Sequence, residues 1–252
     1  MDTNPKATKY FLDEGERLLR SKMTHHTFSG NTDADKLVNN IENYPHAFVI
    51  ACIMDRQIKA ERAWIIPYKL KTRIGDFKFK TLSNLSEDEI KRYMTKPKDL
   101  HRYSAIMTHN CFTAIQRIRS QFKGDASNIW KGNLSSAEIV YRFLQFDGIG
   151  QKIATMATNI LIRDFKVKVS DKYSVDISID GLVPRVMKRV YGLSKKADST
   201  ELIFFARSIN PEYPGILDIG AWHIGREWCK PKNPKCTNCP LADTCNFMIS
   251  SI

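Results

Sequence analysis

The stretch LQFDGIGQKIA, residues 144–154, decides the fold of this 252-residue chain. It places a Gly-x-Gly turn between two helical patterns. Glycine permits positive φ and close backbone approach, so backbone N–H groups here can bind a phosphate. A dinucleotide site would need a preceding strand and a third glycine where Ile153 stands. The turn therefore predicts a phosphate contact blind to base sequence, made through Gly148, Ile149, Gly150 and Gln151.

Helical patterns dominate on both sides of the turn. They cover residues 10–21, 47–70, 107–122, 136–146, 151–165, 182–191 and 199–206. Pro67 is expected to interrupt the end of the second pattern. Ser86 followed by Glu89 has the form of a capping box and predicts the start of a further short helix. Since no period-two strands, repeats or low-complexity linkers recur, the predicted fold class is all-α.

Composition favours a polyanionic partner such as nucleic acid. With 39 Lys and Arg against 27 Asp and Glu, the formal net charge is +12, and a hydrophobic content of 42% is enough for a core. The longest apolar run, Ala47–Met54, is too short to cross a bilayer, and the polar start is no signal peptide. We expect a cytoplasmic protein without a membrane partner, associated with the nucleoid if the source is prokaryotic.

Four of the six cysteines form a tight run, and without an export signal this favours metal over disulfides. The run has the spacing C-x6-C-x2-C-x5-C and consists of Cys229, Cys236, Cys239 and Cys245. Zinc and an iron–sulfur cluster both accept four thiolates. Only one short C-x2-C pair is present, so the wide arms favour a [4Fe–4S] cluster, with zinc as the alternative. Cys52 and Cys111 stand apart and are expected to be inert packing residues.

Lysines surround the cysteine run. Lys230, Lys232 and Lys235 lie in a loop stiffened by two prolines, where they could present ammonium groups to DNA phosphates. Alternatively, they only balance the negative charge of the cluster and its thiolates. Both roles are compatible.

These features together resemble the helix-hairpin-helix (HhH-GPD) DNA glycosylases, most closely the endonuclease III group, over residues 39–247. The family pattern L-P-G-V-G-[KR]-K-T-A is similar to 146–154, V-D-T-H-I-x-R-V to 179–186, and H-G-R-x-x-C to 223–229. The resemblance implies a six-helix barrel over 38–165, with the helix-hairpin-helix at about 136–163. It also implies an iron–sulfur domain formed by 1–37 and 166–252.

The resemblance also implies a chemistry. Lys152 matches the amine that attacks C1′ of the sugar and forms a Schiff base, and Asp180 matches the carboxylate that helps the base leave. Asp176 is a rival carboxylate, while a surface lysine and a helix N-cap are the structural alternatives. The implied function is base-excision repair: a monomeric DNA glycosylase with AP lyase activity, acting on double-stranded DNA that contains a damaged base or an abasic site.

Such an enzyme must flip a nucleotide out and fill the gap in the stack. Gln57 lies in a segment, 55–60, that resembles the family's S-A-Q-x-T-D at the glutamine alone, and is the candidate plug. The loop that contains Leu100, His101, Arg102 and Tyr103 matches the family's second wedge, and an ordinary connecting loop is an equal alternative.

Departures from the family pattern leave other functions open. Asp147 replaces the hairpin proline, Ile153 replaces a threonine, and residues 163–178 form an additional basic segment, so the substrate need not be an oxidised pyrimidine. Adenine-removing relatives carry a catalytic glutamate where this chain has Cys52 and Ile53. A monofunctional adenine or mismatch glycosylase is one alternative, and a non-catalytic [4Fe–4S] DNA-binding protein is the other.

Overall fold

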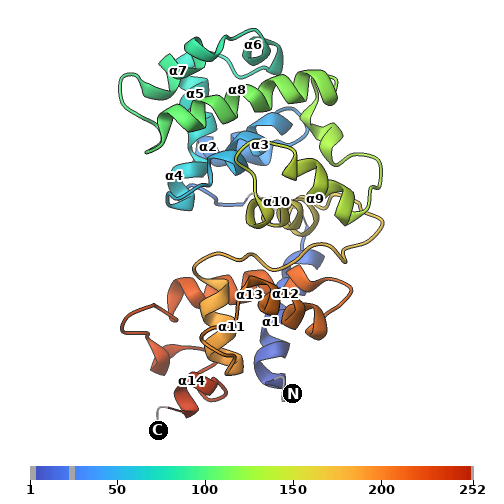
Figure 1. Cartoon of the computed structure of the whole chain (residues 1–252), viewed down its shortest axis with the longest axis vertical. Helices are drawn as coiled ribbons and strands as arrows, with labels where there is room; N and C mark the ends of the chain where they lie inside the picture. The colour runs from blue at the N-terminus through green and yellow to red at the C-terminus, as the bar shows by residue number, and fades with distance from the viewer. Residues whose placement is uncertain (1–3, 23–25, 251–252) are drawn as a thin grey trace. The chain divides into compact units, whose positions relative to one another are not determined.

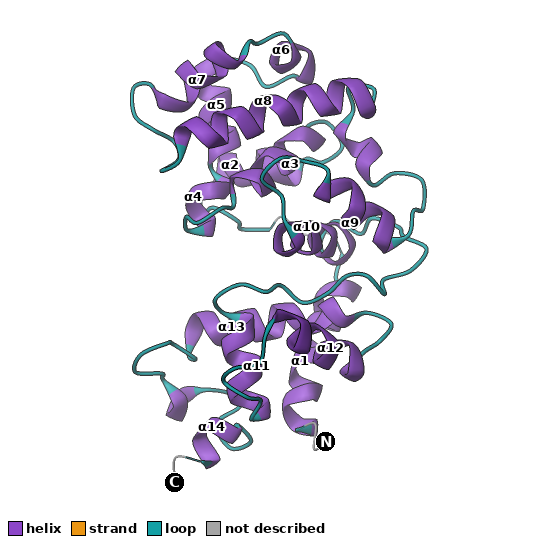
Figure 2. Ribbon diagram, in the orientation of Figure 1, coloured by secondary structure: helices purple, strands orange, loops and turns teal. Residues whose placement is uncertain are grey.

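The computed structural model describes residues 4–22 and 26–250, and every regular element within these ranges is a helix (Figure 1). Figure 2 shows the helices joined by loops alone, which confirms the predicted all-α fold class. The chain forms two compact units. The central unit comprises Met23–Leu134 and Glu138–Ala157, and the terminal unit comprises Met1–Lys22, Ser135–Ala137 and Thr158–Ile252. The sequence analysis expects the central domain at residues 38–165, so both its start and its end lie later there than the start at Met23 and the end at Ala157 in the structure.

The central unit is built around one fully buried helix that is apolar except for His46. Its elements are α2 (Thr32–Asn39), α3 (Pro45–Met54), α4 (Ala60–Trp64), α5 (Ile66–Ile74), α6 (Phe79–Ser83), α7 (Glu87–Thr95), α8 (Ser104–Gln121), η1 (Ala126–Ile129), most of α9 (Ser136–Leu144) and the start of α10 (Gln151–Arg163). Every residue of α3 is buried, because α2, α4, α5, α8 and η1 pack around it. A helix that is apolar on all sides needs such an enclosure.

Two local signals in this unit can be compared with the structure. The capping box is confirmed: the Glu89 N–H donates to Ser86 Oγ at 3.3 Å, and the Ser86 N–H donates to Glu89 Oε2 at 2.8 Å. The expected interruption near Pro67 is present: α4 ends at Trp64, and a new helix, α5, begins at Ile66 with this proline in its first turn. A helix start leaves its N–H groups without intrahelical acceptors, so a residue that has no N–H is accommodated there.

The terminal unit contains the N-terminal helix together with the cysteine-rich segment. Its elements are α1 (Pro5–Arg20), the end of α10, α11 (Val183–Tyr191), α12 (Ser199–Ile209), η2 (Pro214–Leu217), α13 (Asp218–Glu227), η3 (Cys236–Asn238) and α14 (Asn246–Ile249). The helix α1 packs on α13 and η2. A Cβ on Gly15 would lie 2.2 Å from the Ile216 carbonyl oxygen, so this close approach requires glycine.

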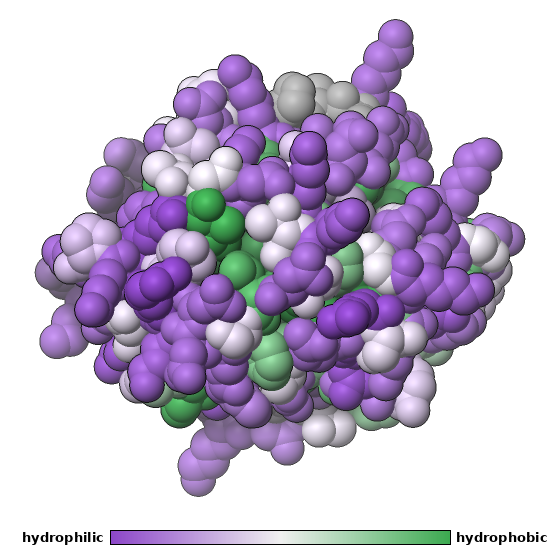
Figure 3. All heavy atoms as spheres, turned by 90° about the horizontal axis from the view of Figure 1, so that it is seen from above, coloured by the Kyte–Doolittle hydropathy of each residue, from purple (hydrophilic) through white to green (hydrophobic). Residues whose placement is uncertain are grey.

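The two isolated cysteines lie in the core, and the surface is mostly polar. Cys52 and Cys111 are buried, which confirms them as packing residues, and burial raises the pKa of the Cys111 thiol to about 12. Polar side chains cover most of the face shown in Figure 3, with hydrophobic side chains in small separate areas. No helix in the described part of the chain is long and apolar enough to span a membrane.

Candidate functional site

The glycine turn between α9 and α10 has the shape that the sequence predicts. Gly148 adopts φ +82°, and a Cβ there would lie 2.2 Å from Asn110 Nδ2, so the position admits only glycine. The side chain of Ile149 is buried and anchors the turn. Gly150 has no atom near its Cβ position and leaves the backbone open to a ligand. The backbone N–H groups of the turn can therefore bind a phosphate, whereas the side chain of Ile149 is buried and cannot contact a ligand.

Lys152, the second residue of α10, pairs with a buried carboxylate. Its Nζ lies 3.3 Å from Oδ2 of Asp55, and the side chains are 36% and 8% exposed respectively. Asp55 follows Met54 directly as the C-cap of α3, so the most buried helix of the unit fixes its position. Buried carboxylates need a paired charge, and Lys152 supplies it.

Asp55 is the site residue that the sequence reasoning missed. It lies two positions before Gln57, whereas the catalytic glutamate of the adenine-removing relatives corresponds to Cys52 and Ile53, which carry no carboxylate. The available signal was a lone acidic residue directly after a buried helix. Its partner lies 97 positions away along the chain and could not be recognised from spacing.

Asp180 lies in the terminal unit and caps α11. Its Oδ1 accepts hydrogen bonds from the backbone N–H groups of Leu182 at 2.7 Å and Val183 at 2.8 Å. No donor in the described residues reaches its other oxygen, Oδ2. The rival Asp176 is almost fully buried and forms two hydrogen bonds with Arg207, at 2.8 and 3.0 Å. The carboxylate of Asp176 is thus fully engaged, whereas Asp180 keeps one oxygen for another partner.

A second buried acid holds the segment before Asp180. Asp218, the first residue of α13, accepts a hydrogen bond from the Ser178 N–H at 2.6 Å and one from Ser178 Oγ at 3.2 Å. Burial raises the pKa of Asp218 to about 6, and the nearby charge of Asp180 adds to this effect. Asp218 is therefore a positioning residue for the backbone two residues before Asp180.

The raised pKa of Asp218 predicts a pH-dependent stability. Because the folded pKa of about 6 exceeds the ordinary value of 3.8, the stability from this group is complete below pH 3.8 and is lost as the pH rises through 6. In urea unfolding, wild type should lose about 1.4 kcal/mol relative to Asp218→Asn between about pH 5 and pH 8. An equal difference between the two proteins at both pH values would contradict this assignment.

The two expected wedge segments meet in the central unit. The hydroxyl of Tyr103 donates to Gln57 Oε1 at 2.8 Å, and the Arg102 guanidinium lies 4.7 Å from the centre of the Tyr103 ring. Gln57 itself has φ +54°, an uncommon value for a residue other than glycine. These three side chains form one cluster that combines an amide, an aromatic ring and a cation.

Leu100 and His101 do not belong to this cluster. They are only 6% and 1% exposed, because the loop turns them into the core. Nδ1 of His101 accepts a hydrogen bond from the Tyr103 N–H at 3.0 Å, and burial lowers the pKa of the ring. His101 therefore supports the loop as a neutral side chain, while Arg102 is exposed and Tyr103 is partly exposed.

Two lysines of the basic segment at 163–178 have partners within the terminal unit. The ammonium of Lys166 donates to the carbonyl oxygens of Leu18, Leu19 and Arg163, so it caps the end of α1. The ammonium of Lys172 lies 5.8 Å from the centre of the Tyr213 ring. Helix ends leave unpaired carbonyl oxygens, which explains the position of Lys166.

The four cysteines of the run line one cavity in the terminal unit. Val190, Ile224 and Trp228 form part of its apolar wall. Burial, with the neighbouring cysteines, raises the pKa values of the Cys236 and Cys239 thiols. No three His, Cys, Asp or Glu side chains of the described residues are gathered as around a single metal ion. Four sulfur donors in an apolar cavity fit a cluster of several metal atoms.

Two arginines of α11 bind the loop that begins at Cys229. Arg189 Nη1 lies 3.4 Å from Cys229 Sγ and donates to the Lys230 carbonyl oxygen at 2.7 Å. Arg185 donates to the Cys229 carbonyl oxygen at 2.8 Å and also to the carbonyl of Gly181, next to Asp180. The cysteine loop and the segment of Asp180 thus share one guanidinium.

The lysines around the cysteine run differ in their surroundings. The ammonium of Lys230 donates to the carbonyl oxygen of Arg226 at the end of α13. Lys232 and Lys235 are exposed. Of the three, Lys232 and Lys235 are the ones that can reach a phosphate without first breaking a described hydrogen bond.

Comparison with known proteins supports this description. Residues 229–245 match the family described as the iron-sulfur binding domain of endonuclease III. An adenine DNA glycosylase of Buchnera aphidicola subsp. Acyrthosiphon pisum is 26% identical over 201 residues, 78% of this chain and 50% of that protein. A thymine/uracil-DNA glycosylase of Pyrobaculum aerophilum is 36% identical over 72 residues, 26% of this chain and 31% of that protein. The chain thus spans half or less of the length of these relatives.

Solved structures show the same fold over the whole chain. A trapped endonuclease III–DNA covalent intermediate has a TM-score of 0.65 at 16% identity and covers 100% of this chain and 99% of its own. A thermostable thymine-DNA glycosylase also has a TM-score of 0.65 at 16% identity, with coverages of 99% and 100%. The chain thus shares its helical fold with these structures, and its C-terminal cysteine loop matches the iron–sulfur binding domain of endonuclease III, so the chain is similar to the endonuclease III-like group of the helix-hairpin-helix (HhH-GPD) superfamily.

Proposed function

We propose that this protein is a base-excision-repair DNA glycosylase with AP lyase activity, in which Lys152 is the nucleophile. The observation that carries the proposal is the pair of Lys152 and buried Asp55, 3.3 Å apart, directly after a glycine turn that can bind phosphate. The names of the similar glycosylases support the same reaction class. The substrate is double-stranded DNA that contains a damaged or mispaired base, and the protein acts as a monomer.

The chemistry requires a free amine. Asp55 accepts a proton from the Lys152 ammonium, and the neutral nitrogen then attacks C1′ of the sugar as the bond from C1′ to the base breaks. The base leaves with the bonding electron pair and takes up a proton. The bound nitrogen then loses a proton and forms a double bond to C1′ as the bond from C1′ to O4′ breaks and O4′ takes up a proton, which gives the Schiff base. Loss of a proton from C2′ of this species expels the 3′ phosphate with its bonding electron pair and nicks the strand. The unoccupied oxygen of Asp180 is the group that we assign to stabilise positive charge on the sugar.

Binding would combine backbone and side-chain contacts. The N–H groups at Gly148, Gly150 and Gln151 bind a phosphate of the strand, since the turn leaves them accessible. Gln57 and Arg102 fill the space of the flipped nucleotide. Exposed Lys232 and Lys235 provide further phosphate contacts, which makes binding strongly dependent on salt.

We assign a [4Fe–4S] cluster to Cys229, Cys236, Cys239 and Cys245. The wide spacing of these residues and their common apolar cavity support this type. The cluster, when bound, would supply structural support for the loop of Lys232 and Lys235, with no redox step in the reaction. The purified protein should contain about four iron atoms per chain, show a broad visible absorption band and lose both in Cys236→Ser. Stoichiometric zinc in a colourless protein would contradict the assignment.

A panel of duplexes, each with one modified base, tests the function as a whole. Base excision together with a borohydride-trapped covalent adduct is the expected result. Excision without an adduct would show a monofunctional glycosylase. Binding without either product would show the non-catalytic alternative.

The monofunctional alternative has one specific observation in its favour. While Lys152 is ion-paired with Asp55, its nitrogen is an ammonium that has no free electron pair. If the proton does not move, water would be the nucleophile and Lys152 would only hold Asp55 in place. The relatives named adenine DNA glycosylase agree with that outcome.

A further inference from the structure

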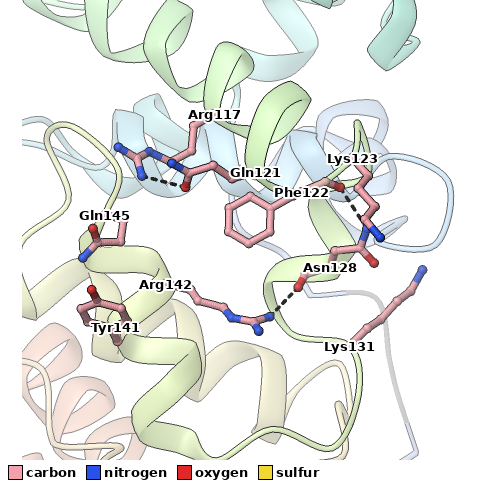
Figure 4. Close-up of a pocket in the computed structure, with 9 residues that line it drawn as sticks. All are labelled: Arg117, Gln121, Phe122, Lys123, Asn128, Lys131, Tyr141, Arg142 and Gln145. Carbon is pink, nitrogen blue, oxygen red and sulfur yellow. Dashed lines mark hydrogen bonds between the residues drawn. The ribbon is translucent and has the colours of Figure 1, made fainter.

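A second site in the central unit is a basic hollow that the proposed chemistry does not use. It has a volume of about 680 Å³ and lies between the end of α8, the segment that follows it and α9. The lining residues that matter are Arg117, Lys123, Lys131, Tyr141, Arg142 and Gln145 (Figure 4). None of them belongs to the glycine turn or to the pair of Lys152 and Asp55.

The hollow is lined by cations and amides, and no carboxylate among the described residues lines it. Lys123 makes no hydrogen bond or ion pair with any described residue. Lys131 pairs with Asp125, but both side chains are largely exposed, at 61% and 42%, so water competes with this pair. Arg117 donates to the Gln121 amide oxygen at 2.9 Å, and its guanidinium lies 5.8 Å from the centre of the Phe146 ring; both partners are neutral, so no carboxylate of the described residues balances its charge. This lining favours an anionic ligand.

Arg142 has a structural role in the same place. It donates to the carbonyl oxygens of Asn128 at 2.7 Å and Ile129 at 3.3 Å, and to Glu138 at 2.6 Å. These bonds connect α9 to η1 and so hold the two walls of the hollow together. Arg142 shapes the site, whereas Arg117, Lys123 and Lys131 have donors left for a ligand.

The two sides of the hollow differ in chemistry. Tyr141 of α9 and Gln145, the residue directly after α9, lie on one side, and Lys123 and Lys131 lie on the other (Figure 4). The Tyr141 side chain is 62% exposed, a large value for an aromatic residue, so its ring is available for stacking. An aromatic ring with an amide opposite a pair of ammonium groups matches a molecule with a flat base at one end and a phosphate at the other.

We propose that this hollow binds a nucleoside phosphate unit of a single DNA strand. The base stacks on Tyr141 with the Gln145 amide at its edge, and the phosphates lie between Lys123, Lys131 and Arg117. The volume is within the range of small-ligand sites, which is roughly 300–1,000 Å³. Such a site would hold an unpaired strand next to the duplex, which excision at Lys152 does not require.

Another hollow in the same unit provides a contrast. Lys36, Lys71, Tyr44 and Tyr68 line it, but so does the carboxylate residue Asp33. Asp33 Oδ1 lies 3.9 Å from the Lys36 ammonium, so a carboxylate of the lining balances part of the positive charge. This hollow therefore offers lysines and tyrosines without the carboxylate-free lining of the first hollow.

Fluorescence anisotropy with a labelled, undamaged single-stranded oligothymidylate tests the proposal on the full chain. Tyr141→Ala should weaken binding about tenfold, as expected for the loss of one stacked base. Lys123→Gln with Lys131→Gln should reduce the slope of log K against log salt by about 0.7 for each lysine. Thymidine monophosphate that competes for the site would identify a free nucleotide as a second source of the same ligand chemistry, and no competition would restrict the site to strands.

A matched control is Lys36→Gln, Lys71→Gln and Tyr68→Ala in the other hollow, which should leave both the affinity and the slope unchanged. Melting temperatures equal to wild type show that each variant is folded. Equal weakening by the control set, or unchanged affinity in Tyr141→Ala, would overturn the proposal, since charge alone would then explain binding. The probe has no lesion and no duplex, so a failure of base excision leaves this result intact.

Discussion

Replacing Lys152 with alanine should abolish the covalent adduct that borohydride traps on DNA with an abasic site, a loss of roughly a thousandfold or more. The nitrogen of this residue is the atom proposed to bond to C1′, so the substitution removes the nucleophile itself. Affinity for the same duplex should change little, because phosphate contacts at the glycine turn come from the backbone. Gel electrophoresis of trapped complexes, with anisotropy for binding, measures both quantities.

Lys168→Ala is the matched control for this experiment, since Lys168 is an exposed lysine in the segment that was expected to be basic. It should retain the full amount of adduct. An adduct of normal yield in Lys152→Ala would place the nucleophile on another residue. A retained visible absorption band and an unchanged melting temperature would show that the variant is folded with its cluster site intact.

Features that lie close together in the chain could be predicted from the sequence. The glycine turn occupies a few consecutive residues, and the capping box of Ser86 and Glu89 spans one helical turn. The four cysteines fall within seventeen residues, so they needed no knowledge of the fold to be recognised as one site. In each case the spacing itself carries the physical requirement, whether positive φ, reciprocal hydrogen bonds or a shared ligand.

Features that depend on tertiary packing could not be predicted in this way. Asp55 and Lys152 are 97 positions apart, and neither position is unusual by itself. Burial of Leu100 and His101 results from the way their loop turns, since a loop residue can face the core or the solvent with the same sequence. The position of Lys166 at the end of α1 could not be predicted either, because the carbonyl oxygens of Leu18 and Leu19 are distant in the sequence.

The pair of Asp55 and Lys152 leads to the second large effect. Asp55→Asn keeps the shape of the side chain but removes the charge and the capacity to take up a proton. The rate of adduct formation should fall about a hundredfold or more, within the usual range for a general base. Binding of the abasic duplex should remain close to that of wild type, because Asp55 is buried and far too enclosed to contact a phosphate.

The control for Asp55 is Asp147→Asn, which removes an exposed carboxylate from the glycine turn instead of a buried one. Loss of this negative charge should strengthen binding of any duplex slightly and leave the rate of adduct formation per bound complex unchanged.

Single-turnover rates measured over a range of pH show whether Asp55 acts as a base or only positions Lys152. If Asp55 is the base, the Asn variant loses the part of the rate that depends on proton transfer, and raising the pH restores it by deprotonating the amine directly. A variant that is slow at every pH by the same factor would instead show that Asp55 only positions Lys152, because a missing orienting contact does not respond to hydroxide.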